Sequence, residues 1–380
     1  MKVSRLLLRI LILLLLPSLA NAAPGLVPKP PALAAKAWLL TDYRSGQVLV
    51  EHNADERVEP ASLTKMMTAY VVFSEIAKGT IREDDVVPVS EKAWRMQGSK
   101  MFIEVGKRVP LQDLLMGMAI QSGNDASVAL AEHVAGSEDA FVDLMNLYAR
   151  RLGLTHTRFT NATGWPHPDH YTTARDLARL AAALIRDFPD HYALYRKKEY
   201  TWNNIRQFNR NRLLWIDERV DGIKTGHTEA AGYCLVTSAQ QDGMRLISVV
   251  LGTASDKART TASRKLLNYG FRFYETFLLH QADEPLTEMR IWKGAKEMLS
   301  LGLAEDLWIT IPRGQRKQVE ASMSVDTQLM APARKGEPHG EVVIRLGDKV
   351  IAKKPLVALE DVPEGGLWRT LVDSVLLMFE

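Results

Sequence analysis

The spacing of apolar residues divides the chain into regions of different predicted secondary structure. Two apolar segments, Ala37–Tyr43 and Gln47–Glu51, flank Arg44-Ser45-Gly46, a pattern typical of a β-hairpin. From Ser62 to about Asp190, apolar residues recur every three or four positions, which predicts helices. The predicted helices are Leu63–Ile76, Leu111–Met118, Asp125–Val134, Ala140–Leu152 and Ala174–Ile185.

Strands are predicted again in the third quarter of the chain. Gly222–Thr228, Tyr233–Ala239 and Arg245–Leu251 are short and rich in Val, Ile and Thr, and Asp242-Gly243 suits a two-residue turn. A helix over Lys257–Leu279 follows. Strands at both ends with helices between them predict one sheet whose strands come from distant parts of the chain, so we expect a single α+β domain over 35–280. A Pro-rich leader, 23–34, precedes it and completes the first domain, 23–280.

Beyond residue 281 the pattern changes to short strands separated by turns. They are Met289–Trp292, Leu307–Ile311, Gln318–Met323 and Val342–Ile351, the last with a turn at Gly347-Asp348. We expect a small all-β domain over 281–363. The remaining segment, 364–380, contains Leu367–Phe379, whose apolar residues fill one half of a helical wheel. It is too short to span a bilayer, so we expect a helix lying on a membrane surface, with packing on the β domain or in a dimer as the alternative.

The N-terminus has the pattern of a signal peptide. Lys2, Arg5 and Arg9 precede the apolar run Ile10–Leu16, and Ala20-Asn21-Ala22 suits cleavage after Ala22. We therefore expect a signal peptide over 1–22 and export. Its removal takes away three basic residues and no acidic one, so the formal charge of +3 falls to about zero in the mature chain, and no nucleic-acid partner is expected.

Several polar residues are expected to have no catalytic role. The only cysteine, Cys234, lies in an apolar strand and is expected to be a buried, inert thiol. His167-Pro168-Asp169-His170 resembles a metal-binding pair but lacks a third ligand, so we expect it in a surface loop. Because no H-E-x-x-H motif occurs either, we expect no metal and no cofactor.

Three short motifs point to nucleophilic catalysis. Ser62-Leu63-Thr64-Lys65 is the only S-x-x-K, and its serine and lysine lie one helical turn apart on the same face. A serine hydroxyl needs a base within hydrogen-bond reach, and a lysine can serve if desolvation and a second cation lower its pKa. Ser122-Gly123-Asn124 offers a second hydroxyl and an amide. Lys224-Thr225-Gly226 offers the second cation, a donor for an anion, and a glycine beside which a substrate backbone can approach.

Each motif alone has a structural explanation, such as a helix cap or a polar loop, but the three in this order form a known set. With glycine at the centre of the second motif, the chain resembles the low-molecular-mass penicillin-binding proteins that are D-alanyl-D-alanine carboxypeptidases. The resemblance extends to Pro60–Met67, Gln121–Ala126, Asn209–Asn211, Asp221–His227 and Gly270–Thr276. It implies a β-lactamase/DD-peptidase-like domain, with an antiparallel sheet and a helical subdomain, followed by the small all-β domain and the amphipathic helix.

The resemblance also implies roles for the motif residues. Ser62 would attack the carbonyl between the two D-alanines of a peptidoglycan stem pentapeptide, with Lys65 as general base. Backbone N–H groups of Ser62 and His227 would form the oxyanion hole. The other implied roles are a proton relay to the departing D-alanine (Ser122, Lys224) and orientation of the substrate amide and of the base (Asn124).

The same resemblance implies how the substrate is held and where the protein works. Thr225 and Arg259 would bind the terminal carboxylate beside Lys224 and Gly226, although the residues around Arg259 depart from the family pattern, and Arg210 would give electrostatic support. β-Lactam antibiotics would acylate the serine as inhibitors. The expected location is the periplasmic face of the bacterial inner membrane.

Three other functions use related folds or motifs. A class A β-lactamase needs a glutamate in E-x-x-L-N, and the nearest segment here, Asp143-Leu144-Met145-Asn146, lacks it. A DD-endopeptidase or transpeptidase uses the same acyl-enzyme, so the motifs leave that alternative open. A non-catalytic scaffold is disfavoured because Ser62, Lys65, Ser122 and Lys224 are all present.

Overall fold

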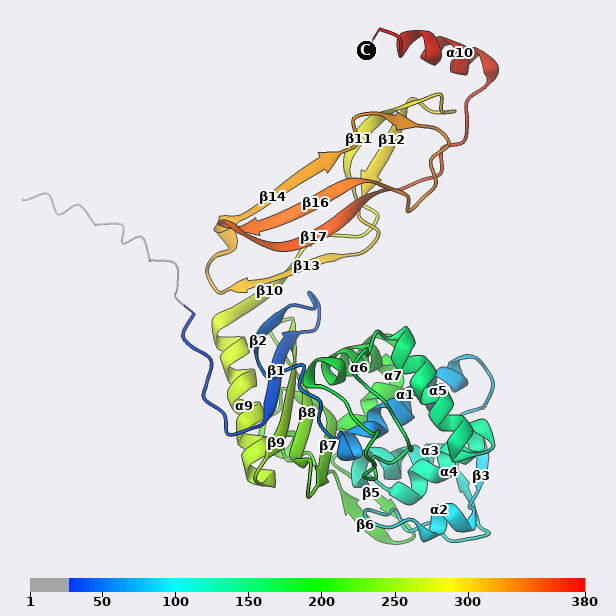
Figure 1. The fold of residues 1–380 in the computed structure, drawn as a ribbon, viewed down its shortest axis with the longest axis vertical. Helices are drawn as coiled ribbons and strands as arrows, with labels where there is room; N and C mark the ends of the chain where they lie inside the picture. Colours follow the sequence, from blue (N-terminus) through cyan, green and yellow to red (C-terminus); the bar gives the residue numbers. More distant parts are fainter. Residues whose placement is uncertain (1–26, 380) are drawn as a thin grey trace, which may run out of the picture.

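The computed structural model describes residues 27–379, which form two successive parts and a short terminal helix (Figure 1). The predicted signal peptide lies outside these residues. Within 27–379, no helix has the length and apolar character needed to cross a membrane.

The first part is built on one five-stranded antiparallel sheet with the strand order β2-β1-β9-β8-β7. Its strands are β1 (Ala37–Asp42), β2 (Val48–His52), β7 (Val220–Thr228), β8 (Gly232–Gln241) and β9 (Met244–Thr253). The turn between β8 and β9 has φ of 51° at Asp242 and 79° at Gly243, as a tight two-residue hairpin requires. Because the first two strands pair with the last three, the predicted α+β domain with a sheet of distant segments is confirmed.

Helices cover both faces of this sheet (Figure 1). α9 (Asp256–Phe273) covers one face, and the helical subdomain covers the other. Serine or threonine side chains at Ser137, Thr173 and Ser255 accept the capping bonds that begin α5, α6 and α9. The helical subdomain comprises η1 (Ala61–Thr64), α1 (Lys65–Ala77), α2 (Glu91–Arg95), α3 (Leu111–Met116), the π turn η2 (Gly117–Gln121), α4 (Asn124–Ala135), α5 (Glu138–Arg151), α6 (Ala174–Asp187), α7 (Pro189–Tyr192) and η3 (Ala193–Arg196). The single turn α8 (Leu213–Ile216) instead packs in the cluster that contains α9.

Two small hairpins lie in or beside the predicted helical region and were not expected from its periodicity. β3 (Val86–Pro88) pairs with β4 (Arg108–Pro110), and β5 (Glu199–Trp202) pairs with β6 (Ile205–Phe208). The second hairpin turns at Asn203 and Asn204, whose φ values are 46° and 59°. Asparagine tolerates this left-handed region better than other non-glycine residues, which explains the tight turn there.

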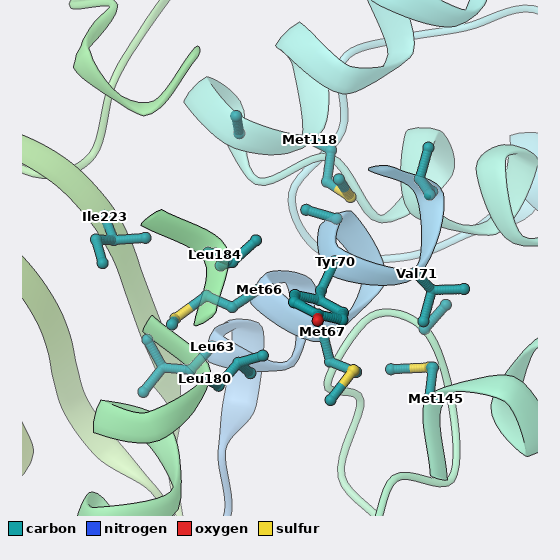
Figure 2. Close-up of a cluster of buried hydrophobic side chains, with 14 of the residues drawn as sticks. Leu63, Met66, Met67, Tyr70, Val71, Met118, Met145, Leu180, Leu184 and Ile223 are labelled. Carbon is teal, nitrogen blue, oxygen red and sulfur yellow. The ribbon is translucent and has the colours of Figure 1, made fainter. Parts of the chain in front are cut away.

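α1 is the central helix of the first core. Its residues are buried on nearly every side, and Figure 2 shows Met66, Met67 and Tyr70 surrounded by apolar side chains from other elements. Leu63, in the turn before α1, packs in the same cluster. A close-packed interior holds its side chains in fixed positions, so the start of α1 is rigidly placed.

The helix predicted over Lys257–Leu279 is wrong beyond residue 273. α9 ends at Phe273, and β10 (Tyr274–His280) pairs antiparallel with β13 (Leu307–Pro312). Arg313 donates to the carbonyl oxygens of Phe271 and Tyr274 and so satisfies acceptors at the helix end. The apolar spacing of 274–279 suits a helix or a strand, and pairing with a strand distant in sequence decides the outcome.

The second part is all β, as predicted. Its larger sheet has the order β14-β16-β17-β12-β11-β15, and β10 with β13 forms a smaller one. The strands of the larger sheet are β11 (Pro285–Trp292), β12 (Met298–Gly302), β14 (Val319–Val325), β15 (Leu329–Met330), β16 (Pro338–Leu346) and β17 (Lys349–Ala358), and a short turn, η4 (Arg316–Gln318), precedes β14. α10 (Leu367–Leu376) follows at the far end of the molecule from β5 and β6 (Figure 1).

Candidate active site

Ser62 lies in η1, the short turn that leads into α1. The residue before it, Ala61, has φ of 48°, a left-handed conformation that costs energy for a residue with a Cβ. Ser62 is half-buried and lines a cleft of about 1030 Å³. The sharp turn therefore presents the serine hydroxyl to the cleft while the apolar residues of α1 hold the turn in place.

Lys65 is buried directly behind Ser62. Its Nζ lies 3.0 Å from Ser62 Oγ, 2.7 Å from Asn124 Oδ1 and 2.7 Å from the carbonyl oxygen of Thr163. Burial lowers the pKa of Lys65 to about 7; the charge of Asp125 works against this shift, and that of Arg210 adds to it. A lysine with such a pKa is partly neutral at physiological pH and can accept a proton.

Lys224 occupies the other side of the same buried polar cluster. Its Nζ donates to Ser122 Oγ at 2.8 Å and to the carbonyl oxygen of Thr225 at 3.1 Å. Burial, followed by the charges of Lys65, Arg210 and Arg259, lowers the pKa of Lys224 well below its usual range. The charge of Arg210 therefore acts on both buried lysines, and it lowers the pKa of each.

The second motif lies between the π turn η2 and α4. Ser122 has φ of 66° and ψ of 36°, so the chain reverses at this residue and its hydroxyl reaches Lys224. Asn124, the first residue of α4, donates through Nδ2 to the carbonyl oxygen of Gln97 while its Oδ1 faces Lys65. Asp125 accepts from the backbone N–H groups of the loop at 101–103, which fixes that loop beside the motif.

The third motif lies on β7, the edge strand beside the serine turn. A Cβ at Gly226 would lie 3.0 Å from the carbonyl oxygen of Pro60, so glycine allows β7 to pack closely against η1. The structure therefore gives Gly226 a packing role next to the nucleophile. Thr225 and His227 line the cleft, and the imidazole of His227 lies 4.0 Å from the ring of Tyr233, centroid to centroid.

Both predicted substrate-binding arginines line the cleft, but they differ in how many protein groups they bind. Arg259 is buried; it donates to the carbonyl oxygens of Gly226 and Cys234 and forms an ion pair with Asp256. Arg210 is exposed and donates to the carbonyl oxygen of Gln121. Arg259 is thus largely occupied by protein groups, whereas Arg210 lines the cleft and donates one hydrogen bond to a protein acceptor among the described residues.

A loop behind Lys65 contains functional residues that the motifs did not identify. Thr163 supplies the carbonyl that accepts from Lys65, and Asn161 Oδ1 accepts from the backbone N–H groups of Thr163 and Gly164. His170 is buried, not in a surface loop as expected, and its ring contacts Thr64 Oγ1 at 2.9 Å and Thr160 Oγ1 at 3.0 Å. Burial lowers the pKa of His170 to about 4, so it is neutral in this bridge between the loop and the serine turn.

Other predictions can be compared with the structure directly. Cys234 is buried in β8, as expected, and burial raises the pKa of its thiol. Asp143 belongs to the segment nearest to the E-x-x-L-N motif of class A β-lactamases; it is exposed on α5 and does not line the cleft. Among residues 27–379, no three His, Cys, Asp or Glu side chains come together as a metal site would require.

Comparison with known proteins agrees with this geometry. The family model described as D-alanyl-D-alanine carboxypeptidase matches residues 25–255, and that of the C-terminal domain of penicillin-binding protein 5 matches 274–364. D-alanyl-D-alanine carboxypeptidase DacC of Escherichia coli is 48% identical, with 92% of this chain and 89% of the relative covered. The crystal structure of penicillin binding protein 5 from Haemophilus influenzae has a TM-score of 0.85 at 44% identity, covering 89% of this chain and all of the other.

The fold and these relatives define a serine peptidase of the penicillin-binding class. The chain belongs to the D-alanyl-D-alanine carboxypeptidase family. Its reaction is the removal of the terminal D-alanine from peptidoglycan stem peptides, and it binds penicillin.

Proposed function

We propose that Ser62 forms the acyl-enzyme of this carboxypeptidase and that neutral Lys65 is the base. The hydrogen bonds of Lys65 carry this proposal. When neutral, its amine has two N–H groups, and the oxygens of Asn124 and Thr163 are placed to accept both. The lone pair then faces Ser62 Oγ at 3.0 Å, where it can take the hydroxyl proton as the serine attacks.

Ser122 and Lys224 are proposed to deliver the proton to the departing amine. Their side chains are joined by a 2.8 Å hydrogen bond, and Ser122 lines the cleft. The proposed oxyanion hole consists of the backbone N–H groups of Ser62 and His227. The close packing of Gly226 against the serine turn supports this assignment, because it brings these two segments together.

The terminal carboxylate is proposed to lie between Thr225, Arg210 and Arg259. Thr225 lines the cleft with both arginines, and the two guanidinium groups are close enough for Arg259 to lower the pKa of Arg210. Since the N–H groups of Arg259 are mostly bound to protein acceptors, Arg210 has more donors for the substrate, and Arg259 acts mainly through its charge and through holding Gly226.

Arg210→Ala is expected to raise KM for D-Ala-D-Ala peptides about tenfold or more, because a charge-assisted contact with the carboxylate is lost. Amidating the C-terminus of the peptide should weaken wild-type turnover to a similar degree. The two losses should not add, since they remove the same contact. Release of D-alanine measured by mass spectrometry gives both values and tests the proposed function directly.

Arg82→Ala is a control at an exposed arginine outside the cleft, and this variant should match the wild type. Fully additive losses from Arg210→Ala and from amidation of the peptide would place the carboxylate elsewhere.

We further propose that α10 anchors the enzyme on the periplasmic face of the inner membrane. Its apolar side chains are exposed, with Leu367 at 93% and Trp368 at 78%, rather than packed on the β domain. Its polar side faces that domain instead. Asp373 is buried and accepts from the backbone N–H of Lys293 at 2.6 Å, and Arg369 pairs with Glu297. An apolar face turned away from its own domain suits burial in the acyl boundary of a bilayer.

Deleting 364–380 is expected to release an active enzyme from the membrane fraction. The contacts of α10 with the β domain are few and polar, so the truncated protein should keep its carboxypeptidase activity. High salt alone should not release the intact protein, because apolar burial rather than ion pairing dominates the binding. Fractionation with and without salt measures both effects. An intact protein found in the soluble fraction, or a truncated one that unfolds, would contradict the anchor.

A further inference from the structure

His170 is a buried titratable side chain that the proposed chemistry does not use. It is only 2% exposed, and it ends the loop that carries Thr163, which we call loop 160–170. Burial of a polar ring is costly unless its nitrogens are hydrogen-bonded. Nε2 of His170 lies 2.9 Å from Thr64 Oγ1, and Nδ1 lies 3.0 Å from Thr160 Oγ1. The ring therefore joins loop 160–170 to the serine turn.

The neighbouring amide of Asn161 determines which ring nitrogen carries the proton. Its Oδ1 accepts from the backbone N–H groups of residues 163–165, so its Nδ2 is the donor that faces His170 Nδ1 at 3.3 Å. A ring nitrogen that faces an N–H donor is the acceptor, and the proton of the neutral ring then lies on Nε2. His170 thus donates to Thr64 Oγ1 and accepts at Nδ1 from the hydroxyl of Thr160 and the amide of Asn161.

These bonds close a circuit around the amine of Lys65. On one side, His170 binds Thr64, the residue before Lys65. On the other side, His170 contacts Asn161, whose Oδ1 accepts from the N–H of Thr163. The carbonyl oxygen of Thr163 then accepts from Lys65 Nζ at 2.7 Å. A movement of the ring would therefore shift the acceptor of Lys65 relative to the helix start that carries this lysine.

Few other bonds hold loop 160–170 against η1 and α1. Among residues 27–379, three hydrogen bonds join them: those of Thr64 and Lys65 just described, and one from Thr68 Oγ1 to the carbonyl oxygen of Ala162 at 2.7 Å. Two of the three use backbone carbonyls of the loop. His170 supplies the third through its side chain, so a substitution there removes one bond and leaves the other two acceptors in place.

We infer that His170 is a positioning residue for the general base: its neutral ring holds the Thr163 carbonyl where it directs the amine lone pair of Lys65 toward Ser62. This role rests on the proposed function, in which neutral Lys65 is the base. The amine has two N–H groups, and Asn124 and Thr163 accept them. If the Thr163 carbonyl moves, one N–H loses its acceptor and the lone pair is no longer aimed at the serine. A misplacement of about 1 Å in such a group can cost roughly a hundredfold in rate.

The test measures acylation of the purified enzyme by a fluorescent penicillin across a range of pH. His170→Leu fills similar space without hydrogen bonds, and its acylation rate constant above pH 7 should fall about tenfold or more. His170→Gln keeps a donor and an acceptor for the bridge and should stay within about threefold of the wild type. The amount of label bound at saturation gives the concentration of active enzyme, so unfolded protein does not lower the measured rate constant.

The pH profile distinguishes positioning from a general loss of stability. Burial is the main cause of the lowered pKa of Lys65, so a loop that loosens at Thr163 and admits water raises this pKa. The profile of His170→Leu should therefore move to higher pH by about half a unit or more, and that of His170→Gln should follow the wild type. Asp125 and Arg210, whose charges also act on this pKa, are the same in all variants. Burial keeps the pKa of His170 at about 4, so its ring stays neutral where Lys65 titrates.

Two further variants test the bridge itself. Thr64→Val removes the oxygen that His170 binds and should resemble His170→Leu, which keeps the test available if the leucine variant does not fold. The double variant should lose no more than either single one, because both remove the same hydrogen bond. His133→Leu is a matched control, since His133 also joins two segments, through Asp85 at 2.9 Å, at the opposite end of α4 from Asn124. It should leave the rate constant and the profile unchanged.

The outcomes separate the positioning role from the proposed function. A rate constant and profile of His170→Leu that match the wild type overturn the role of His170 alone. A lower rate constant with an unmoved profile also overturns it, because that pattern shows only a structural effect. Additive losses in the double variant overturn the bridge to Thr64. A wild-type profile that stays flat through pH 7 overturns Lys65 as the base, on which the role of His170 rests.

Discussion

Ser62→Ala is expected to abolish both D-alanine release and covalent labelling by penicillin. Alanine has no nucleophile, and no other hydroxyl in the described site lies beside Lys65 Nζ as Ser62 does. The acyl-enzyme therefore cannot form, and the remaining rate should fall by several orders of magnitude. The fold should survive, because Ser62 is half-buried and the apolar residues that follow it hold the turn.

Mass spectrometry after penicillin treatment measures this result. In the wild type, the adduct should map to a peptide containing Pro60–Met66. Ser99 also lines the cleft, so Ser99→Ala is a matched control that should still be labelled. Labelling that persists in Ser62→Ala would show that a different residue is the nucleophile.

Lys65→Arg is expected to give the second large loss, in acylation rate. Guanidinium stays protonated at these pH values, so it cannot take the serine proton. Loss of general base catalysis alone costs typically ~10²–10⁴-fold, and the larger side chain also disturbs contacts to Asn124 and Thr163. Lys78→Arg is a matched control because Lys78 lies at the end of the same helix, half-exposed and paired with Glu75. Near-wild-type acylation by Lys65→Arg would show that another group is the base.

The pH dependence of wild-type acylation gives independent evidence on the same lysine. Burial lowers the pKa of Lys65 to about 7, and only the neutral amine acts as base. The rate should therefore be roughly constant above pH 7 and fall about tenfold for each pH unit below it. Arg210→Ala removes a charge that lowers this pKa, so the profile of that variant should move to higher pH. A flat profile through pH 7 would contradict Lys65 as the base.

Much of the architecture was predictable from the sequence because local patterns and the final fold agree. Helical periodicity places α1, α4, α5 and α6 within a few residues of their observed bounds, and Asp242-Gly243 marks its hairpin. The exceptions are the hairpins β3–β4 and β5–β6, which the periodicity did not predict, and 274–279, where helical spacing gives way to pairing between β10 and β13. A strand partner distant in sequence leaves no local signal, so the pattern could not reveal it.

The candidate site was predictable to a similar extent and for a related reason. The three motifs contain side chains whose chemistry is visible in their residue types, and the structure brings Ser62, Lys65, Ser122, Asn124 and Lys224 together. The carbonyl of Thr163 was missed because a backbone acceptor has no residue-type signature. His170 was placed on the surface because its neighbours Pro168 and Asp169 are typical of loops, whereas burial depends on what packs over them.

The sequence by itself determined the chemical groups, their order along the chain, the apolar faces of the helices and the amphipathic character of α10. Only the tertiary structure decided which charges act on one another. Burial of Lys65, the approach of Arg210, and the hydrogen bonds of Arg259 to the carbonyl oxygens of Gly226 and Cys234 all arise between segments far apart in sequence. The same holds for α10, whose polar side binds the β domain through Asp373 and leaves its apolar side exposed. The local pattern specifies which side chains of a segment can be buried. The neighbours that bury them are present only in the folded chain, and these neighbours set the pKa of each titratable side chain and the surface that stays exposed.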